Sequence, residues 1–345
     1  MRVAVIGLGR MGRFYARTIA SLGPDAQLAA VADPDPVARA AVERELSVPF
    51  AASEPADVVG RTDVDAVIIA TPTSSHAELV VAAARAGKAI FCEKPLALSL
   101  QHTQAALSAV HAAGVLLQMG FMRRFDAGYQ NARALIQAGR VGRPLTFKAV
   151  GRDPSCPPLG YANPDHSGGL VLDMGIHDFD LARWLMSSEV ERVSADGALL
   201  VCTHFSEVGD IDNAVINLRF ENGALGNVEI SRNAGYGYDV WTEVLGSEGS
   251  VVVGRDVRAA ADSTGVQLFT QSAGQENETP HFVRRFGAAY RTQIERFVEC
   301  VEHGREPPVG GADALAAFEI GLAATRSWQT GHPVAVNEVR EPTPA

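Results

Sequence analysis

The chain has 345 residues, of which 47% are hydrophobic and 20% charged, and its net charge is −10. A length above roughly 250 to 300 residues exceeds what one hydrophobic core usually holds, so we expect two domains. The acidic balance argues against binding to nucleic acid or an anionic membrane, because both partners require a basic surface. No stretch approaches the roughly 18 apolar residues of a membrane span, and the N-terminal segment lacks the apolar core of a signal peptide.

The four cysteines, Cys92, Cys156, Cys202 and Cys300, are far apart in the sequence and form no CxxC pair. They suggest neither a disulfide framework nor a thiolate zinc site. We therefore expect a reduced, cytoplasmic protein.

In residues 1–120, short apolar runs alternate with helical patterns. Strands are expected at residues 2–6, 27–32, 65–70, 89–92 and 115–119. This alternation is typical of a doubly wound parallel sheet, whose ligand lies beyond the carboxyl ends of the strands.

A glycine-rich loop follows the first strand. It consists of Gly7, Leu8, Gly9, Arg10, Met11 and Gly12. In a dinucleotide-binding loop of this spacing, Gly7 permits the turn, Gly9 lets the backbone approach the phosphates, and Gly12 allows the helix to pack closely on the strand. The pattern alone is weak evidence, but its position between a strand and a helix predicts a dinucleotide site.

Asp33 ends the second strand, 21 residues after Gly12. A carboxylate there suits the ribose hydroxyls of NAD and repels the 2′-phosphate of NADP, so we predict NAD as the cofactor. The alternative is a turn or cap residue ahead of a helix that starts near Pro36.

Two further segments lie at strand ends of the first domain, where a cofactor would bind. Thr71, Pro72, Thr73 and His76 follow the strand at 65–70, while Glu93 and Lys94 precede Pro95 after the strand at 89–92. An exposed lysine is usually a surface group, but a lysine at a strand end near a cofactor is a candidate functional residue. His102 and His111 are interpreted as structural or surface residues.

The pattern of residues 121–345 predicts an α+β domain with a large, mostly antiparallel open sheet. Strands are expected at 145–150, 190–201, 214–220, 224–231, 238–245 and 250–253, with a hairpin turn at Asn222-Gly223. Helices are expected from about 121 to 138, at 285–302 and at 312–328. The proline-rich segment 151–167 is either a plain crossover or the wall of a binding pocket.

The segment from Gly168 to Trp184 has the densest titratable chemistry. A helix beginning near Asp173 would place Asp173 and His177 on one face, with Asp180 a turn further on that side. A carboxylate beside an imidazole makes a general base near neutral pH. The alternatives are a solvated helix N-terminus or an Asp–His–Asp metal site, and we expect no metal. Asp178 points off this face and is expected to be a surface or capping acid.

Together these segments resemble the glucose-fructose oxidoreductase, inositol dehydrogenase and rhizopine-catabolism superfamily. GLGRMG, TPTSSH, EKP and GGLVLDMGIHDFD carry the resemblance, and MRRFDAGY, GRDPSCPP and GYGYDVWTEVLGSEG are most similar to inositol 2-dehydrogenases. The resemblance implies a Rossmann domain, a cis bond before Pro95, and a dimer or tetramer formed through the second-domain sheet. It places Lys94, Asp173 and His177 at catalytic positions, and Arg124, Asp153 and Tyr236 where relatives contact substrate hydroxyls.

The leading hypothesis is therefore NAD-dependent oxidation of one secondary hydroxyl of a cyclitol, myo-inositol or a stereoisomer such as scyllo-inositol, to the ketone. The alternatives are a sugar or anhydrosugar dehydrogenase of the same superfamily, an NAD-dependent glycosidase and a dinucleotide sensor. A sensor has no need of a base such as His177.

Overall fold

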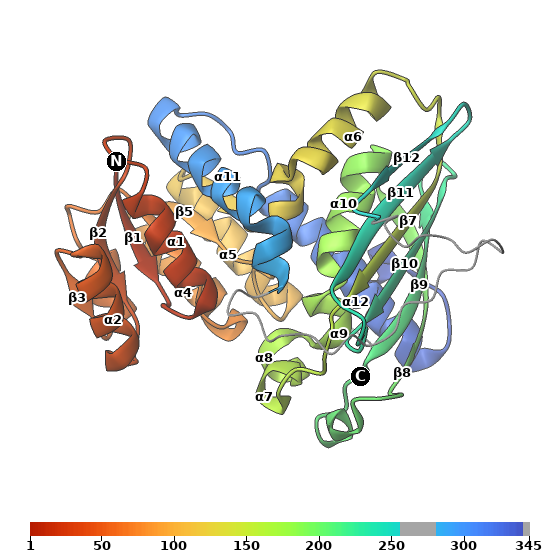
Figure 1. Cartoon of the computed structure of the whole chain (residues 1–345), viewed down its shortest axis with the longest axis horizontal. Helices are drawn as coiled ribbons and strands as arrows, with labels where there is room; N and C mark the ends of the chain where they lie inside the picture. Colours follow the sequence, from red (N-terminus) through yellow and green to blue (C-terminus); the bar gives the residue numbers. More distant parts are fainter. Residues whose placement is uncertain (256–280, 341–345) are drawn as a thin grey trace. The chain divides into compact units, whose positions relative to one another are not determined.

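The structure is a computed structural model that describes residues 1–255 and 281–340 (Figure 1). It divides into two compact units: unit 1 consists of Met1–Phe125 and Ala288–Leu315, and unit 2 of Asp126–Gly287 and Ala316–Ala345. Residues 288–315 return to unit 1 because they complete its core. There the Phe91 and Phe297 rings pack edge to face, and the Met119 N–H donates to Val309 O at 3.1 Å.

Unit 1 contains a parallel sheet of six strands in the order β3-β2-β1-β4-β5-β6. The strands are β1 (Arg2–Ile6), β2 (Gln27–Ala32), β3 (Ala51–Ala52), β4 (Ala66–Ile69), β5 (Ala89–Cys92) and β6 (Leu117–Met119). The predicted doubly wound parallel sheet is confirmed. Because the strand order reverses between β1 and β4, their carboxyl ends form the point where such sheets bind ligands.

The helices of unit 1 alternate with these strands. They are α1 (Arg10–Ala20), α2 (Pro36–Leu46), α3 (Pro55–Val59), α4 (His76–Arg85) and α5 (Leu100–Ala113), with the 3₁₀ turns η1 (Thr73–Ser75) and η2 (Met122–Phe125). Side-chain caps begin α2 and α5: the Asp35 side chain accepts from the Val37 N–H, and the Ser99 side chain accepts from the His102 N–H. Since crossovers are right-handed, α1 and α2 lie on the opposite face of the sheet from α4 and α5.

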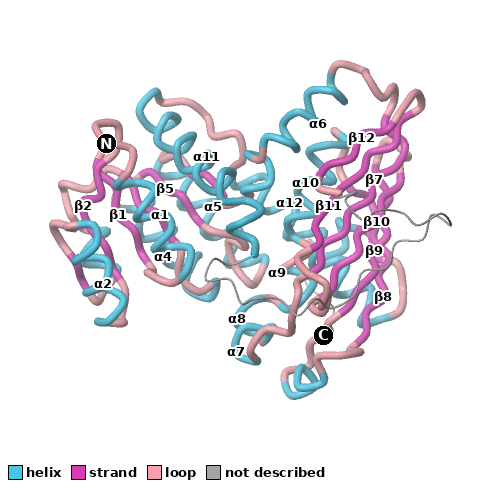
Figure 2. Tube along the Cα trace, viewed as in Figure 1, coloured by secondary structure: helices cyan, strands magenta, loops and turns pink. Residues whose placement is uncertain are grey.

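Unit 2 contains a sheet of seven strands in the order β12-β11-β7-β10-β9-β8-β13, side by side in Figure 2. The strands are β7 (Pro144–Arg152), β8 (Val190–Ala198), β9 (Asn213–Phe220), β10 (Leu225–Ser231), β11 (Asp239–Gly246), β12 (Ser250–Val253) and β13 (Val334–Ala335). Among the described strands of this sheet, only the β7–β10 pair is parallel, so the predicted mostly antiparallel sheet is confirmed. The predicted hairpin turn joins β9 to β10, and Gly223 adopts φ +85° there.

Helices cover one face of this sheet (Figure 1). Helices α6 (Ala127–Gln137), α9 (Gly169–Asp173) and α10 (Ile176–Met186) contact its strands. The other short elements of unit 2 are α7 (Leu159–Ala162), α8 (Pro164–Ser167) and the 3₁₀ turns η3 (Thr203–Glu207) and η4 (Val336–Val339). Helices α11 (His281–His303) and α12 (Gly311–Thr330) each contribute residues to both units. The segment 151–167, for which the sequence indicated only a loop, includes α7 and α8.

The strand expected at 190–201 ends three residues early, at Ala198. The cause is Asp212, whose carboxylate accepts hydrogen bonds from the backbone N–H groups of Leu200, Val201 and Cys202 at 2.8, 2.6 and 2.6 Å. These amides are therefore turned toward one side chain instead of a neighbouring strand.

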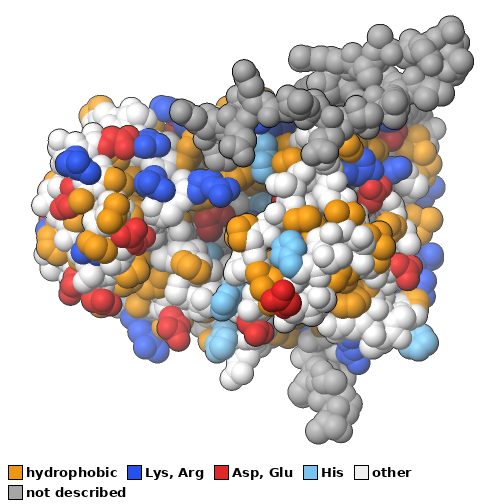
Figure 3. Space-filling view, turned by 60° about the horizontal axis from the view of Figure 1, so that its bottom comes forward, with side chains coloured by type: hydrophobic (Ala, Val, Ile, Leu, Met, Phe, Trp, Pro, Cys, Tyr) orange, Lys and Arg blue, Asp and Glu red, His pale blue; other side chains and the backbone are white. Residues whose placement is uncertain are grey.

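No helix within residues 1–255 and 281–340 is long and apolar enough to cross a membrane. On the described part of the face drawn in Figure 3, acidic and basic side chains are interspersed.

Candidate active site

The glycine loop of unit 1 has the geometry that a dinucleotide requires. Gly7 adopts φ +87°, and a Cβ there would lie 2.7 Å from Ala70 O; a Cβ at Gly12 would lie 1.7 Å from Gly7 O. Gly9 differs, because its φ of −64° suits any residue and a Cβ there would meet no atom within 4 Å. Open space beside the N-cap of α1 is where the pyrophosphate of a dinucleotide fits. The loop residues therefore suit NAD.

Asp33 follows β2 and faces this loop. Its Oδ2 accepts a hydrogen bond from the Leu8 N–H at 2.6 Å, and its Oδ1 accepts from the Asp35 N–H at 2.8 Å. The Arg39 Nη1 donates to the backbone oxygen of Asp33 at 2.5 Å. The carboxylate is thus fixed beside Leu8, with its arginine neighbour bound to the backbone oxygen.

His76 connects the two strand-end segments that follow β4 and β5. Its Nδ1 lies 2.8 Å from Pro95 O and its Nε2 lies 2.9 Å from Thr71 O. The ring is buried, and this burial lowers its pKa. His76 therefore contacts both segments by hydrogen bonding to their backbones. Pro72 and Thr73 lie in the turn ahead of it, and the Lys94–Pro95 bond is cis, as expected.

Glu93 and Lys94 come directly after β5. Tyr15 on α1 donates a hydrogen bond to Glu93 Oε1, and the Gln293 amide donates to the Tyr15 hydroxyl at 2.9 Å. Burial raises the pKa of Glu93. Glu93 is therefore held by a buried network, and it also accepts the backbone N–H of Lys94 at 3.2 Å.

Arg124, a predicted substrate contact, lies in η2 at the end of β6. Its Nη2 forms an ion pair with Asp313 Oδ1 at 2.8 Å, and only 7% of its side chain is exposed. The structure thus gives it a partner within unit 1. Its substrate role stays a prediction.

In unit 2, Asp173 ends α9 and His177 lies in the first turn of α10. The expected continuous helix is wrong, since it breaks at Met174-Gly175. Both of these residues keep right-handed helical dihedrals, so the chain still turns as a helix does between Asp173 and His177. A Cβ at Gly175 would lie 2.5 Å from Val171 O, which explains why glycine occupies the break. Asp173 and His177 are both at least nine-tenths buried.

The Asp173 carboxylate has a cationic neighbour that the sequence did not reveal. Arg232, directly after β10, donates from Nη2 to Asp173 Oδ2 at 3.1 Å, and the Tyr161 hydroxyl lies 3.5 Å from Oδ1. Arg232 is 59 residues from Asp173 in sequence, and no local pattern links them. Only the proximity of β10 to α9 brings them together.

The expectation that Asp178 is a surface acid is wrong, because its side chain is fully buried. It lies in the first turn of α10, and its capping role stays a prediction. Asp180 is 1% exposed. The cause is the position of α10, which packs against β7 and α6 and buries most of its circumference. His102 and His111 on α5 are exposed, as expected.

Asp153 directly follows β7, and Tyr236 lies just ahead of β11. The Asp153 N–H donates to Ser231 O at 2.8 Å, and its carboxylate is 3.6 Å from His281 Nε2. The Tyr236 hydroxyl donates to Asp239 Oδ2 at 2.7 Å and accepts from Arg152 Nη1 at 2.6 Å. Tyr236 is therefore already oriented by a charged pair. Both residues stay predicted substrate contacts.

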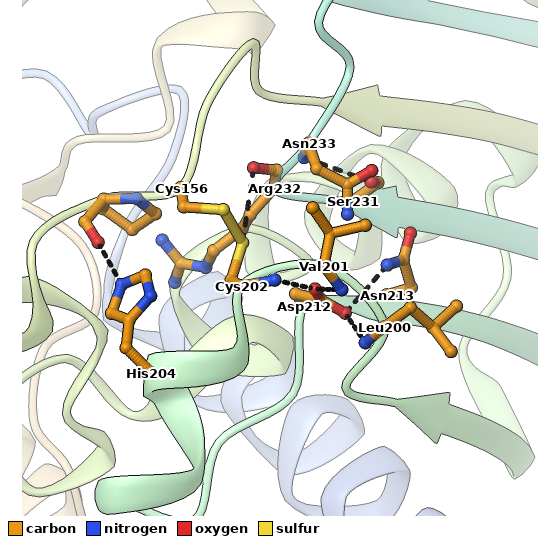
Figure 4. Close-up of a disulfide and its surroundings, with 11 residues drawn as sticks. Cys156, Leu200, Val201, Cys202, His204, Asp212, Asn213, Ser231, Arg232 and Asn233 are labelled. Carbon is orange, nitrogen blue, oxygen red and sulfur yellow. Dashed lines mark hydrogen bonds between the residues drawn. A yellow bond between two sulfur atoms is a disulfide. The ribbon is translucent and has the colours of Figure 1, made fainter.

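The expectation that the cysteines form no disulfide is wrong: Cys156 and Cys202 are joined, with a Cα–Cα distance of 5.7 Å (Figure 4). The bond ties the segment before α7 to the start of η3. Cys202 Sγ also lies 3.9 Å from the Arg232 carbonyl oxygen, a contact only, since a disulfide sulfur has no hydrogen to donate. The two cysteines pair because the fold brings their segments together, and their spacing in the sequence does not show this. Cys92 and Cys300 are free and buried.

Within the described residues, no three His, Cys, Asp or Glu side chains form a group that could hold a metal ion. Asp173 has a guanidinium at its Oδ2 instead.

A dinucleotide-binding loop in unit 1 and a buried acid and histidine in unit 2 define the class, a dinucleotide-dependent oxidoreductase. Residues 1–121 match the family model described as "Oxidoreductase family, NAD-binding Rossmann fold", and residues 133–336 match its "C-terminal alpha/beta domain". The chain therefore belongs to the glucose-fructose oxidoreductase, inositol dehydrogenase and rhizopine-catabolism family, and its N-terminal domain is an NAD-binding Rossmann fold.

Several relatives match along nearly the whole chain. The scyllo-inositol 2-dehydrogenase (NAD(+)) of Bacillus subtilis is 39% identical, covering 99% of this chain and 97% of the relative. The myo-inositol 2-dehydrogenase of Thermotoga maritima is 38% identical, covering 98% and 99%. A crystal structure of scyllo-inositol dehydrogenase from Lactobacillus casei with bound NAD(H) and scyllo-inositol superposes with a TM-score of 0.87, at 26% identity and 98% and 99% coverage.

Proposed function

We propose that this protein is an NAD-dependent dehydrogenase that oxidises one secondary hydroxyl of a cyclitol, myo-inositol or scyllo-inositol, to a ketone. The observation that carries the proposal is the buried pair of Asp173 and His177 at the α9–α10 junction, in a chain whose other unit is an NAD-binding fold. The relatives named for inositol oxidation match the full length of the chain, which supports a cyclitol substrate.

The reaction removes a hydride from the ring carbon and a proton from its hydroxyl, giving the ketone, NADH and a proton. NAD, when bound, accepts the hydride. His177 accepts the hydroxyl proton as general base, and Asp173 orients the imidazole and stabilises its positive charge. Lys94 donates a hydrogen bond to the reacting oxygen and stabilises its alkoxide character.

The proposal assigns positions to the remaining predicted residues. Arg124, Asp153 and Tyr236 contact the other ring hydroxyls. The cofactor contacts are Gly7, Leu8, Gly9, Arg10, Met11, Gly12, Asp33, Thr71, Pro72, Thr73, His76, Glu93 and Lys94. Of these, His76 and Glu93 act by holding strand ends, since their side chains already bind protein partners.

The decisive experiment measures NADH formation from a panel of inositol stereoisomers, pyranoses and anhydrosugars. We expect the highest kcat/KM with an inositol. A higher kcat/KM with a pyranose assigns the protein to sugar dehydrogenases instead, and glycoside cleavage without net NADH assigns it to the NAD-dependent glycosidases.

We further propose a homo-oligomer, a dimer or tetramer, formed through the outer face of the unit 2 sheet. Val215, Leu225, Leu245 and Val252 lie on β9, β10, β11 and β12 of this sheet and are 43 to 50% exposed. Exposed apolar side chains grouped on one sheet face favour association. Light scattering of wild-type protein and a Leu225→Glu variant tests this, with the variant expected to shift toward monomer.

A cytoplasmic location stays a prediction. The Cys156–Cys202 bond counts against it, because disulfides are rare in reducing compartments. Thiol trapping of the protein in freshly lysed cells, followed by fractionation, tests the location and the disulfide together.

A further inference from the structure

Arg232 is among the largest fully buried side chains of the described residues, with no exposed surface. Its backbone N–H donates to Asp212 O at 2.9 Å, and its Nη2 donates to Asp173 Oδ2 at 3.1 Å. Its Nε and Nη1 have no hydrogen-bond partner among the described residues. A guanidinium removed from water in this way requires a nearby negative charge.

Two nearby carboxylates could supply that charge, those of Asp173 and Asp210. The Asp210 oxygens accept from the Leu170 N–H at 3.2 and 3.1 Å, so Asp210 is engaged at the start of α9. Burial raises the pKa of Asp210, and the nearby Arg232 charge offsets this only in part. Arg232 forms its hydrogen-bonded ion pair with Asp173.

Tyr161 on α7 completes the surroundings of this pair. The Arg232 guanidinium carbon lies 5.7 Å from the centre of the Tyr161 ring, close enough for a cation–π contact. The Tyr161 hydroxyl lies 3.5 Å from Asp173 Oδ1. Both oxygens of Asp173 therefore face defined groups, one cationic and one a hydroxyl, which restricts the orientation of the carboxylate.

We propose that Arg232 is a positioning residue: its buried guanidinium holds the Asp173 carboxylate in one orientation, so that Asp173 can support His177 during proton transfer. This inference rests on the proposed roles of Asp173 and His177. Because Arg232 has no exposed surface, it acts through Asp173 and not on the substrate.

The test is a double-mutant cycle in kcat, using Arg232→Gln, Asp173→Asn and the double variant. We expect Arg232→Gln to lower kcat by about a hundredfold, the cost of a displaced catalytic group, with the KM for NAD unchanged. In the Asp173→Asn background the same change alters kcat by less than about twofold, because its effect runs through Asp173. Arg232→Lys, which keeps the charge, retains more activity than Arg232→Gln. The matched control is Arg305→Gln, in an exposed pair with Glu299, and its kcat equals wild type.

Equal losses from Arg232→Gln in the wild-type and Asp173→Asn backgrounds overturn the inference, as does a wild-type kcat for Arg232→Gln. Where Arg232→Gln does not fold, judged by circular dichroism and thermal unfolding, the cycle is run with Arg232→Lys. The cycle uses the best substrate from the panel, so a sugar preference overturns the proposed cyclitol function while the coupling of Arg232 to Asp173 is still measured.

Discussion

The Leu8 backbone N–H donates a hydrogen bond of 2.6 Å to the carboxylate of Asp33. This bond links the glycine loop to the residue that follows β2. The carboxylate is therefore oriented before any cofactor binds. An oriented acceptor loses little entropy when it binds the ribose hydroxyls of NAD.

Asp33→Ala removes this acceptor. We expect the KM for NAD to rise by roughly ten- to a hundredfold, since a hydrogen bond to a charged group contributes about 1.5–3 kcal/mol. The preference for NAD over NADP falls as well, because the repulsion of the 2′-phosphate is lost. Steady-state kinetics with both cofactors measure this, and a wild-type preference for NADP contradicts the assignment of Asp33.

Substitutions at Gly9 and Gly12 are expected to affect different properties, cofactor binding at Gly9 and stability at Gly12. Gly9→Ala has room for its methyl group, so we expect wild-type thermal stability but weaker NAD binding. Gly12→Ala places a methyl group 1.7 Å from Gly7 O and is expected to cost about 1–3 kcal/mol or more of stability. Thermal unfolding and NAD titration of both variants measure the two effects. Equal destabilisation by both changes speaks against the assigned difference.

His177→Ala is expected to reduce kcat by about 10² to 10⁴, the usual contribution of a general base. The matched control is His102→Ala, on the exposed side of α5, with unchanged kcat. Steady-state NADH formation with the best substrate checks both. Near wild-type turnover of His177→Ala removes it from the mechanism.

The Cys156–Cys202 bond closes a segment of 46 residues. In the chain-entropy description, a loop of this length contributes about 4 kcal/mol by restricting the unfolded chain. We expect Cys156→Ser to unfold at lower denaturant concentration than oxidised wild type, and a reducing agent to destabilise wild type but not the variant. Non-reducing peptide mapping must recover the linked peptides, and its failure to do so refutes the bond.

His76 gives stability a pH dependence. Burial lowers its pKa below the ordinary value, so the unfolded chain binds this proton more readily than the folded one. The contribution of neutral His76 to the free energy of unfolding is fully present above the pKa of about 6.5 in the unfolded chain. It is lost as the pH falls below that value toward the lowered pKa of the folded state. Denaturant unfolding between pH 7.5 and 5.5 should show a smaller decline for His76→Gln than for wild type. His111→Gln, exposed on α5, should decline as wild type does.

Sequence alone determined whatever depends on local pattern. The burial of β1 and β4 follows from continuous apolar runs, the loop from Gly7 to Gly12 from its glycine spacing, and the Asn222-Gly223 hairpin from its turn residues, because each signal lies within about ten neighbouring positions. The order of strands and helices also gave the parallel sheet of unit 1, since a doubly wound sheet needs such alternation.

Tertiary structure alone decided what depends on contacts distant in sequence. Four features depend on segments that only packing brings together. They are the Arg232–Asp173 ion pair, the Cys156–Cys202 bond, the burial of Asp178 and the return of residues 288–315 to unit 1. Spacing cannot reveal them, because the free energy of burial depends on which surfaces meet and not on where they lie along the chain. The sequence predicted Asp173 and His177 as candidate site residues, whereas the Arg232 cation beside Asp173 appears only in the tertiary structure.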